Sequence, residues 1–374
     1  MSPVTAEQLV DVCERAPAYV RAIAPYQPGK PISELAREMG LQESSIVKLA
    51  SNENPRGASP KAIAAMRIAI GATGRYPDGN AYALKDALTK RYGVAHDRIV
   101  LGNGSNDVLE MAARAFLSPK ASAVYSEHAF VVYSLATQAV GATGIVVPAH
   151  NFGHDLDAMS KAIRSDTRVV FIANPNNPTG TWLPPEQIHG FLTKTPADVL
   201  VVLDEAYNEY LDPDLRSNAV AWSEEFPNLV VSRTFSKAYG LAGLRVGYGF
   251  SHPGVIDLMN RVRQPFNVSD IGQVGAAAAL FDDEFVQQST LLNRHGMKAL
   301  TEAFTSLGLS WIPSHGNFVC VKVGKAAEVF QRLLKQGVIV RPIVSYGMPE
   351  HLRVSIGTES ENARFLAALA VSIQ

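Results

Sequence analysis

Residues 232–248 of the chain read Ser232-Arg-Thr-Phe-Ser-Lys-Ala-Tyr-Gly-Leu-Ala-Gly-Leu-Arg-Val-Gly-Tyr248. An apolar, β-rich segment, residues 229–231, precedes this run, and glycines break the turn after its single lysine, Lys237. A strand followed by such a turn is typical of the ligand-binding edge of an α/β sheet. A lysine after a strand is, taken alone, most often a solvated surface charge. A functional role for Lys237 therefore has to be argued from the residues around it.

These surroundings suit a cofactor that has both an aldehyde and a phosphate. A lysine in a glycine- and serine-lined turn can lose its proton and attack an aldehyde, forming a Schiff base. Hydroxyl donors and a fixed cationic fork suit a phosphate, and Thr234, Ser236 and Arg245 lie close to Lys237 in the sequence. Pyridoxal phosphate combines the two groups. The run predicts a pyridoxal phosphate site.

Composition narrows the class of protein. The chain has 374 residues, enough for two domains, and 34 Lys plus Arg against 35 Asp plus Glu give a net charge of −1. This balance does not favour nucleic acid or an anionic membrane as a partner. Cys13 and Cys320 have neither disulfide nor metal spacing, and residues 1–20 have no apolar signal core. We expect a cytoplasmic protein without a bound metal.

Short apolar runs alternate with helical patterns through the middle of the chain, which predicts a doubly wound, mostly parallel α/β sheet. The predicted strands are 99–101, 123–125, 144–147, 169–173, 199–203, 229–233 and 246–250. Beyond Ser269 the pattern changes to one long helix over 283–307, followed by strands at 318–323, 338–342 and 352–356. We predict a large cofactor domain over 46–265 and a smaller, discontinuous α+β domain over 1–45 and 266–374.

A second motif ends another apolar strand. Val199-Leu-Val-Val-Leu-Asp-Glu-Ala-Tyr207 stops at an acidic pair, and a carboxylate there can keep a heterocyclic nitrogen protonated. Asp204 would do this for a pyridine ring, and Tyr207 is placed to donate a hydrogen bond to the ring oxygen. The alternative is that Asp204 only caps the following helix.

Two loops after predicted strands carry polar groups of the same kind. In Ala173-Asn-Pro-Asn-Asn-Pro-Thr-Gly180 the prolines fix the backbone, so Asn177 is held in one direction, although most Asn-Pro pairs are plain turns. Gly102-Asn-Gly-Ser-Asn106 opens a helix, whose exposed amides at Ser105 and Asn106 can bind phosphate. Residue 107 is Asp, which argues against a dinucleotide fingerprint.

Aromatic and cationic residues complete the set of candidates. Phe130 and Tyr133 follow the strand at 123–125, where a ring can stack on a cofactor or simply pack in the core. Arg341 and Arg353 lie inside apolar strand patterns, so each needs a partner. That partner is either a protein carboxylate in a structural ion pair or an anionic group of a substrate.

With these motifs in hand, the chain resembles the fold-type I pyridoxal-phosphate-dependent aminotransferases over nearly its full length. The resemblance is carried by three motifs in order: Asn-Pro-x-Asn-Pro-Thr-Gly, Asp-Glu-Ala-Tyr and Thr-x-Ser-Lys-x-x-x-Leu-Ala-Gly-Leu-Arg. It implies transamination between histidinol phosphate and 2-oxoglutarate, giving imidazole acetol phosphate and glutamate in histidine biosynthesis. Other activities on the same scaffold are those of an aromatic-amino-acid aminotransferase, a threonine-phosphate decarboxylase and, more remotely, a cofactor-sensing regulator with an added DNA-binding domain.

The resemblance also implies roles for individual residues. Lys237 would be the Schiff-base lysine, Asp204 the partner of the pyridine nitrogen, and Tyr207 and Asn177 the ligands of the ring oxygen. Phe130 would stack on the ring. The phosphate would be held by the following groups: Ser236, Arg245 and the amides of Ser105 and Asn106.

Further implied roles concern the substrate and a second subunit. Arg353 would bind an α-carboxylate, and Arg341 and Tyr26 would lie near the distal phosphate. Tyr76, in Arg-Tyr-Pro-Asp at 75–78, would reach the cofactor of the neighbouring subunit in a homodimer. Phe266 departs from the family pattern, because some members have a tyrosine there that is thought to touch the substrate phosphate. Asn106 and His128 depart as well, standing where acidic residues and proline, respectively, are frequent.

Overall fold

A computed structural model describes residues 12–374 of the chain. Residues 1–11, which include the beginning of the predicted small domain, lie outside the described part. The larger body is built on a seven-stranded sheet in the order β2-β8-β7-β6-β5-β3-β4. The strands are β2 (Ile99–Asn103), β3 (Ser122–Ser126), β4 (Thr143–Val147), β5 (Thr167–Ala173), β6 (Leu200–Asp204), β7 (Leu229–Thr234) and β8 (Val246–Phe250).

The sheet is mostly parallel, as predicted. Strands β7, β6, β5, β3 and β4 pair in parallel, and β8 alone runs antiparallel to both of its neighbours, β7 and β2. Successive side chains of a strand point to opposite faces. Along β6, Val201 and Leu203 enter one hydrophobic core, whereas Leu200 and Val202 enter the other. Both faces of the sheet are therefore covered.

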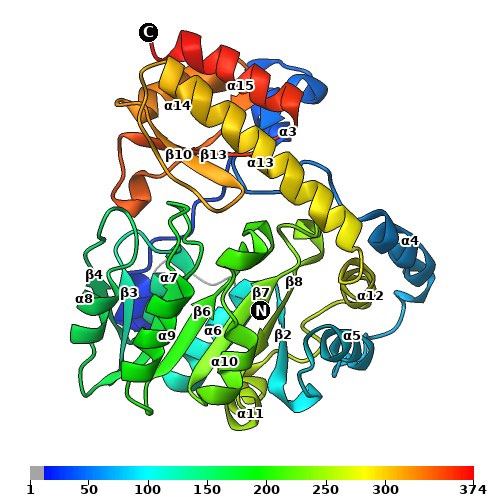
Figure 1. Ribbon diagram of the computed structural model, residues 1–374, viewed down its shortest axis with the longest axis vertical. Coiled ribbons are helices and arrows are strands. Elements are labelled where there is room, and N and C mark those ends of the chain that lie inside the picture. The colour runs from blue at the N-terminus through cyan, green and yellow to red at the C-terminus, as the bar shows by residue number, and fades with distance from the viewer. Residues whose placement is uncertain (1–11) are drawn as a thin grey trace, which may run out of the picture.

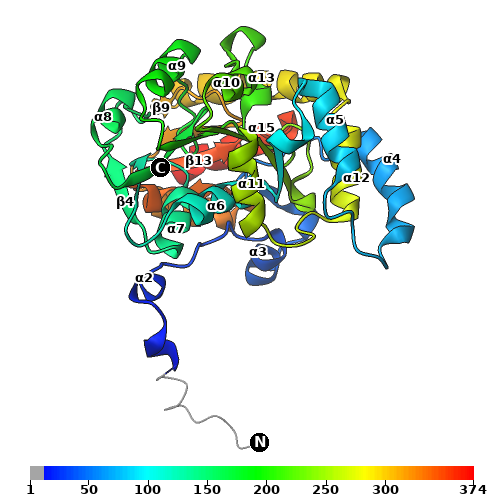
Figure 2. The same cartoon turned by 90° about the horizontal axis from the view of Figure 1, so that it is seen from below.

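Helices cover these two faces (Figures 1 and 2). One core is shared with α4 (Pro60–Ala69), α5 (Tyr82–Tyr92), α8 (Leu156–Lys161), α9 (Pro185–Lys194), α10 (Ala219–Glu225) and α12 (Asp270–Ala279). The other is shared with α6 (Ser105–Phe116), α7 (Val131–Ala139) and α11 (Pro253–Val262). This is the doubly wound arrangement that the alternation of strands and helices predicted.

The smaller body lies above the large sheet in Figure 1 and has its own core. Its four-stranded antiparallel sheet has the order β12-β13-β10-β9, and the parallel pair β1-β11 joins the N-terminal segment to the C-terminal one. The strands are β1 (Val47–Lys48), β9 (Trp311–Ile312), β10 (Phe318–Lys322), β11 (Val338–Ile339), β12 (Arg341–Pro342) and β13 (His351–Ser355). The helices of this body are α3 (Ile32–Met39), α13 (Asp283–Ser306), α14 (Ala326–Lys335) and α15 (Glu359–Ser372). The short helix α2 (Ala18–Arg21) packs instead on α7 of the larger body.

Two details differ from the expected pattern. The single strand predicted over 338–342 is two short strands, because β11 pairs with β1 whereas β12 pairs with β13. Helix α12 follows the predicted domain boundary at residue 266, yet it packs on α4 and α5, and its Ala276 and Ala279 belong to the core of the large sheet. The division of the chain into domains stays a prediction.

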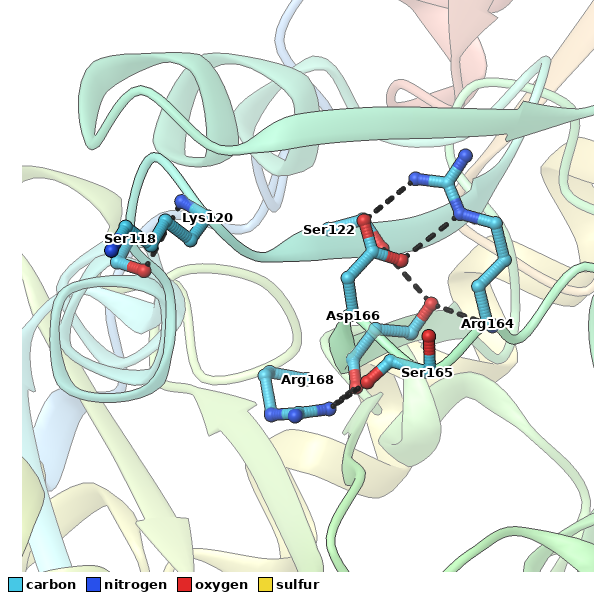
Figure 3. A network of polar contacts seen from close by, with 8 residues as sticks. Ser118, Lys120, Ser122, Arg164, Ser165, Asp166 and Arg168 are labelled. Carbon is cyan, nitrogen blue, oxygen red and sulfur yellow. Dashed lines mark hydrogen bonds and ion pairs between the residues drawn. The ribbon is translucent and has the colours of Figure 1, made fainter.

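The two ends of the parallel strands differ in character. At the amino ends of β3 and β5, Arg164 donates two hydrogen bonds of 3.0 Å to Asp166, whose carboxylate also accepts a 3.2 Å bond from the Ser122 hydroxyl (Figure 3). Nearby, Arg168 donates to the carbonyl oxygen of Ser165 at 2.9 Å. The carboxyl ends face the smaller body and carry the candidate site.

Candidate active site

Lys237 follows the carboxyl end of β7 in the turn that the sequence indicated. Its ammonium group donates a 3.2 Å hydrogen bond to the carbonyl oxygen of Ser51, and Nζ lies 5.8 Å from the centre of the Tyr207 ring. Loss of solvation, with the nearby cations Arg353 and Arg245, lowers the pKa of Lys237 from 10.5 to about 8. At neutral pH about a tenth of this amine is therefore neutral and nucleophilic, far more than for a lysine with the ordinary pKa of 10.5.

Asp204 ends β6 and is buried. Its Oδ2 accepts a 2.8 Å hydrogen bond from the Tyr133 hydroxyl, and its Oδ1 accepts one of 3.2 Å from the backbone N–H of Ala206. Burial raises the pKa of Asp204 to about 6, against the lowering effect of these two bonds. The next element is only a short 3₁₀ turn, Asn208–Tyr210, for which no side chain acts as N-cap. The capping alternative for Asp204 therefore finds no support in the structure.

Groups suited to a phosphate meet at the start of α6. Helix α6 begins at Ser105 after Gly104, whose φ of 77° permits the sharp entry from β2. The first amides of a helix have no intrahelical acceptor, so those of Ser105 and Asn106 remain available to an anion. Arg245 donates a 3.2 Å hydrogen bond to the Ser236 hydroxyl. Its guanidinium lies so close to Gly104 that a Cβ there would collide with it.

The two arginines predicted to meet an anion line the same cavity from the smaller body. Arg353 on β13 is 7% exposed and donates to Oδ1 of Asn177 at 2.6 Å and to the carbonyl oxygen of Ala50 at 2.8 Å. Arg341 on β12 donates to the carbonyl oxygen of Gln27 at 2.6 Å. Within residues 12–374, neither arginine forms an ion pair with a protein carboxylate. This favours a substrate anion over a structural ion pair.

The aromatic candidates take different positions. Phe130 lies at the start of α7 and lines the cavity. Tyr26 also lines it, with its ring 5.6 Å from the Arg341 guanidinium carbon. Tyr76 does not: its side chain is 83% exposed and stacks on Phe266 with ring centres 4.8 Å apart. An exposed tyrosine away from this cavity is available to another subunit.

One cavity unites the remaining candidates between the two bodies. The predicted residues that line it are Tyr26, Ser105, Asn106, Phe130, Asn177, Asp204, Tyr207, Ser236, Lys237, Arg245, Arg341 and Arg353. An amine, a buried carboxylate and a phosphate cradle in one cavity fit a group that has an aldehyde, a ring nitrogen and a phosphate. Among the described residues, no cluster of His, Cys, Asp and Glu is arranged to hold a metal ion.

Some contacts of the candidate site residues could not be read from the sequence. Tyr133 was singled out only for its ring, whereas the structure shows its hydroxyl bound to Asp204. Its position one helical turn after Phe130 is a signal that could have placed both residues at the site. Asn52 and Ser355 contact each other beside Tyr207 although 303 residues separate them in the chain. No local pattern connects such residues.

Comparisons with known proteins agree with this geometry. The model of the family "Aminotransferase class I and II" matches residues 44–369. Histidinol-phosphate aminotransferase 2 of Nitrosospira multiformis is 61% identical over 366 residues, which cover 98% of this chain and 93% of that protein. Histidinol-phosphate aminotransferase of Methylobacillus flagellatus is 63% identical over 354 residues, which cover 95% of this chain and 96% of that protein.

A solved structure is similar over nearly the whole fold. The crystal structure of histidinol-phosphate aminotransferase from Sinorhizobium meliloti, in complex with pyridoxal-5'-phosphate, superposes with a TM-score of 0.88 at 29% identity. The match covers 96% of this chain and 97% of that one. Together with the family model and the relatives at about 60% identity, it leads to one conclusion: the chain belongs to the class I and II aminotransferase family.

Proposed function

We propose that the protein is a pyridoxal-phosphate-dependent aminotransferase that acts on histidinol phosphate and 2-oxoglutarate. The products are imidazole acetol phosphate and glutamate, and the reaction belongs to histidine biosynthesis. The observation that carries the proposal is the meeting of Lys237, Asp204 and the Arg245 cradle in one cavity with two arginines free of protein carboxylates. The high identity to proteins named histidinol-phosphate aminotransferase supports the choice of substrate.

Several groups are placed to hold the cofactor. The amides of Ser105 and Asn106, the Ser236 hydroxyl and the Arg245 guanidinium would bind its phosphate. Phe130 would cover one face of the ring. The amide nitrogen of Asn177 has no protein acceptor among the described residues, because only its Oδ1 is engaged, by Arg353. This nitrogen is therefore available to donate to the ring oxygen, together with the Tyr207 hydroxyl.

The chemistry divides between the cofactor and two side chains. Pyridoxal phosphate, when bound, supplies a ring that accepts electron density from the substrate α-carbon. Lys237, with its lowered pKa, removes a proton from that carbon as a general base. Asp204 holds negative charge in a buried position, where it keeps the ring nitrogen protonated. Tyr133 and the amide of Ala206 fix the direction of that carboxylate.

Both substrates have to use the same pair of arginines. Histidinol phosphate carries a phosphate and no carboxylate, whereas glutamate carries two carboxylates and no phosphate. We propose that Arg353 binds the α-carboxylate of glutamate. Arg341, beside Tyr26, then meets either the distal carboxylate of glutamate or the phosphate of histidinol phosphate.

We also propose a cytoplasmic homodimer in which Tyr76 reaches the neighbouring subunit's cofactor. Tyr76 is exposed and does not line the cavity of its own subunit, which supports this arrangement. No helix among residues 12–374 is both long and apolar enough to cross a membrane. Mixing inactive Lys237→Ala protein with an inactive Tyr76 variant should restore activity through hybrid dimers. A fully active monomer at assay concentration would contradict the shared site.

Stopped-flow spectra test the choice of substrate. The cofactor-loaded protein is mixed separately with histidinol phosphate, phenylalanine and glutamate, and the change of its visible absorption is followed. We expect rapid changes with histidinol phosphate and glutamate and a much slower change with phenylalanine. A wide preference for phenylalanine would replace the proposal by an aromatic-amino-acid aminotransferase. Release of carbon dioxide from a phosphorylated amino acid would indicate a decarboxylase.

A further inference from the structure

Asn52 lies at the junction of the two bodies, in the segment between β1 and α4. The residue is 1% exposed and has a φ of 55°, a left-handed conformation that asparagine tolerates better than most residues. Its backbone carbonyl accepts a 2.9 Å hydrogen bond from the side chain of Asn317. The preceding residue, Ser51, accepts the hydrogen bond from Lys237. The position of Asn52 is therefore fixed next to the reactive lysine.

The side chain of Asn52 forms a closed set of hydrogen bonds with Ser355 on β13. The backbone N–H of Asn52 donates to the Ser355 hydroxyl at 2.8 Å, and that hydroxyl donates to Oδ1 of Asn52 at 3.1 Å. The amide group then points Nδ2 at Tyr207, whose hydroxyl oxygen accepts at 2.9 Å. Flipping the amide would leave the hydroxyl hydrogen of Ser355, a residue only 3% exposed, without this acceptor. The network thus selects one orientation of the amide.

This orientation determines where the proton of Tyr207 can go. The hydroxyl oxygen of Tyr207 already accepts from Asn52, so the tyrosine cannot donate to that amide nitrogen. No protein group within residues 12–374 accepts the Tyr207 proton. The ring of Tyr207 is 3% exposed and borders the cavity that holds Lys237 and Asp204. Its O–H is left to donate into that cavity.

We propose that Asn52 is a positioning residue that, held by Ser355, keeps Tyr207 a hydrogen-bond donor to the ring oxygen of the bound cofactor. The inference rests on the proposed function, because it requires pyridoxal phosphate in the cavity. Ser355 lies two residues after Arg353 on the same strand, so the two side chains share a face of β13. The strand that brings the arginine for the substrate therefore also sets the direction of the Tyr207 proton.

The pH titration of the visible absorption band of the cofactor-loaded protein measures this donor directly. A donor to the ring oxygen stabilises negative charge there, which favours the deprotonated form and lowers the pH midpoint. Tyr207→Phe removes the donor and should raise the midpoint by about one unit or more. Asn52→Asp should raise it nearly as much, because the introduced carboxylate accepts the Tyr207 proton and turns it away from the cofactor.

Two matched variants separate this effect from a general disturbance. Asn52→Gly removes the side chain, tolerates the positive φ and leaves the tyrosine free to donate, so its shift should be less than about half that of Asn52→Asp. The double variant Asn52→Asp with Tyr207→Phe should titrate within about 0.3 unit of Tyr207→Phe alone, because the carboxylate acts through the tyrosine proton. Circular dichroism and thermal unfolding confirm that each variant is folded.

The outcomes are distinct. A wild-type protein that shows no visible band with pyridoxal phosphate would contradict the proposed function itself. A normal band with a midpoint that Asn52→Asp leaves unchanged would contradict only the role of Asn52. A shift that persists undiminished in the Tyr207→Phe background would show that the new charge acts directly and would also overturn the inference. Should Asn52→Asp fail to fold, Ser355→Ala frees the amide to flip; it should raise the midpoint, and no change would contradict the proposal.

Discussion

The two ends of the parallel strands use similar residue types in opposite ways. At the amino ends, Asp166 is held by the exposed Arg164, which lowers the pKa of the Asp166 carboxyl, and by the hydroxyl of Ser122. At the carboxyl ends, burial raises the pKa of Asp204 to about 6 and lowers that of Lys237 to about 8. The amino ends thus carry an ordinary surface ion pair, whereas the carboxyl ends carry two buried groups whose pKa values are shifted toward neutral pH.

The difference shows that the groups suited to catalysis lie at one end of the strands, whereas the other end carries ordinary surface contacts. Exposed ion pairs are screened by water and contribute little. Buried groups with perturbed pKa values are costly, and they cluster where a reaction needs them. The carboxyl ends of the strands also face the smaller body, which adds Arg341 and Arg353 to the cavity. Substitutions at the two ends should therefore differ by orders of magnitude in their effect on turnover.

The largest effect is expected for Lys237→Ala. The variant should still bind pyridoxal phosphate, because the phosphate cradle around Arg245 is intact, yet it should lose essentially all turnover without its general base. Steady-state assays with histidinol phosphate and equilibrium binding of the cofactor check both halves of this expectation. Near-native activity of the variant would end the assignment of Lys237.

Asp204→Asn should have the next largest effect. The side-chain oxygen of the asparagine can still accept the hydrogen bond from Tyr133, but the negative charge beside the ring nitrogen is lost. Loss of such a charge in a buried site is worth several kcal/mol in the transition state, so kcat should fall by ~10³-fold or more. A loss of less than about tenfold would mean that Asp204 has only a structural role.

The two arginines should be distinguished by their substrates. Arg341→Ala should impair histidinol phosphate and glutamate but largely spare phenylalanine, which has no distal anion. Arg353→Ala should impair glutamate and phenylalanine more than histidinol phosphate, which has no carboxylate. Each loss should amount to ~30- to 1000-fold in kcat/KM, the value of a charge-assisted contact of about 2–4 kcal/mol. Equal losses for all three compounds would contradict the assigned roles.

The rate of covalent cofactor uptake by the apoprotein should depend on pH. Only the neutral amine of Lys237 is nucleophilic, and its pKa is lowered to about 8. The initial rate should therefore rise by about tenfold per pH unit below 8 and level off above it. Absorbance after mixing with pyridoxal phosphate follows this rate. A rise that continues toward pH 10 would indicate a lysine with an ordinary pKa.

The smallest effect is expected at the amino ends. Asp166→Asn breaks the paired contact with Arg164 but touches neither the cavity nor the core, so kcat/KM should stay within about twofold of the wild-type value. The variant serves as the matched control for Asp204→Asn, since Asp166 immediately precedes β5 and Asp204 ends the neighbouring strand β6. A large loss of activity in Asp166→Asn would remove the contrast between the two ends.

Much of this arrangement is predictable because it is local. The seven strands of the large sheet are mostly apolar runs. Asp204 ends one of them, and Asn177 and Lys237 follow two others within a few residues. The parallel order then brings them together at one edge. Predicting the hydrogen bond from Tyr133 to Asp204 would also have required the position of Tyr133 on helix α7.

What escaped prediction depends on long-range packing. Asn52 and Ser355 meet only because the smaller body folds against the N-terminal segment. The predicted strand over 338–342 is divided because β11 pairs with β1 whereas β12 pairs with β13, and both partners are remote in the sequence. Helix α12 packs with α4 and α5 across the boundary that the change of sequence pattern predicted at residue 266.

Borohydride reduction of the cofactor-loaded protein followed by peptide mapping tests the central claim most directly. Reduction should attach the cofactor to Lys237 and block tryptic cleavage there, so its mass should appear on the peptide Thr234–Arg245. Lys237→Ala should yield no labelled peptide under the same conditions. Label on a lysine outside this peptide, with Lys237 unmodified, would contradict the account of a cofactor site built at the carboxyl ends of the strands.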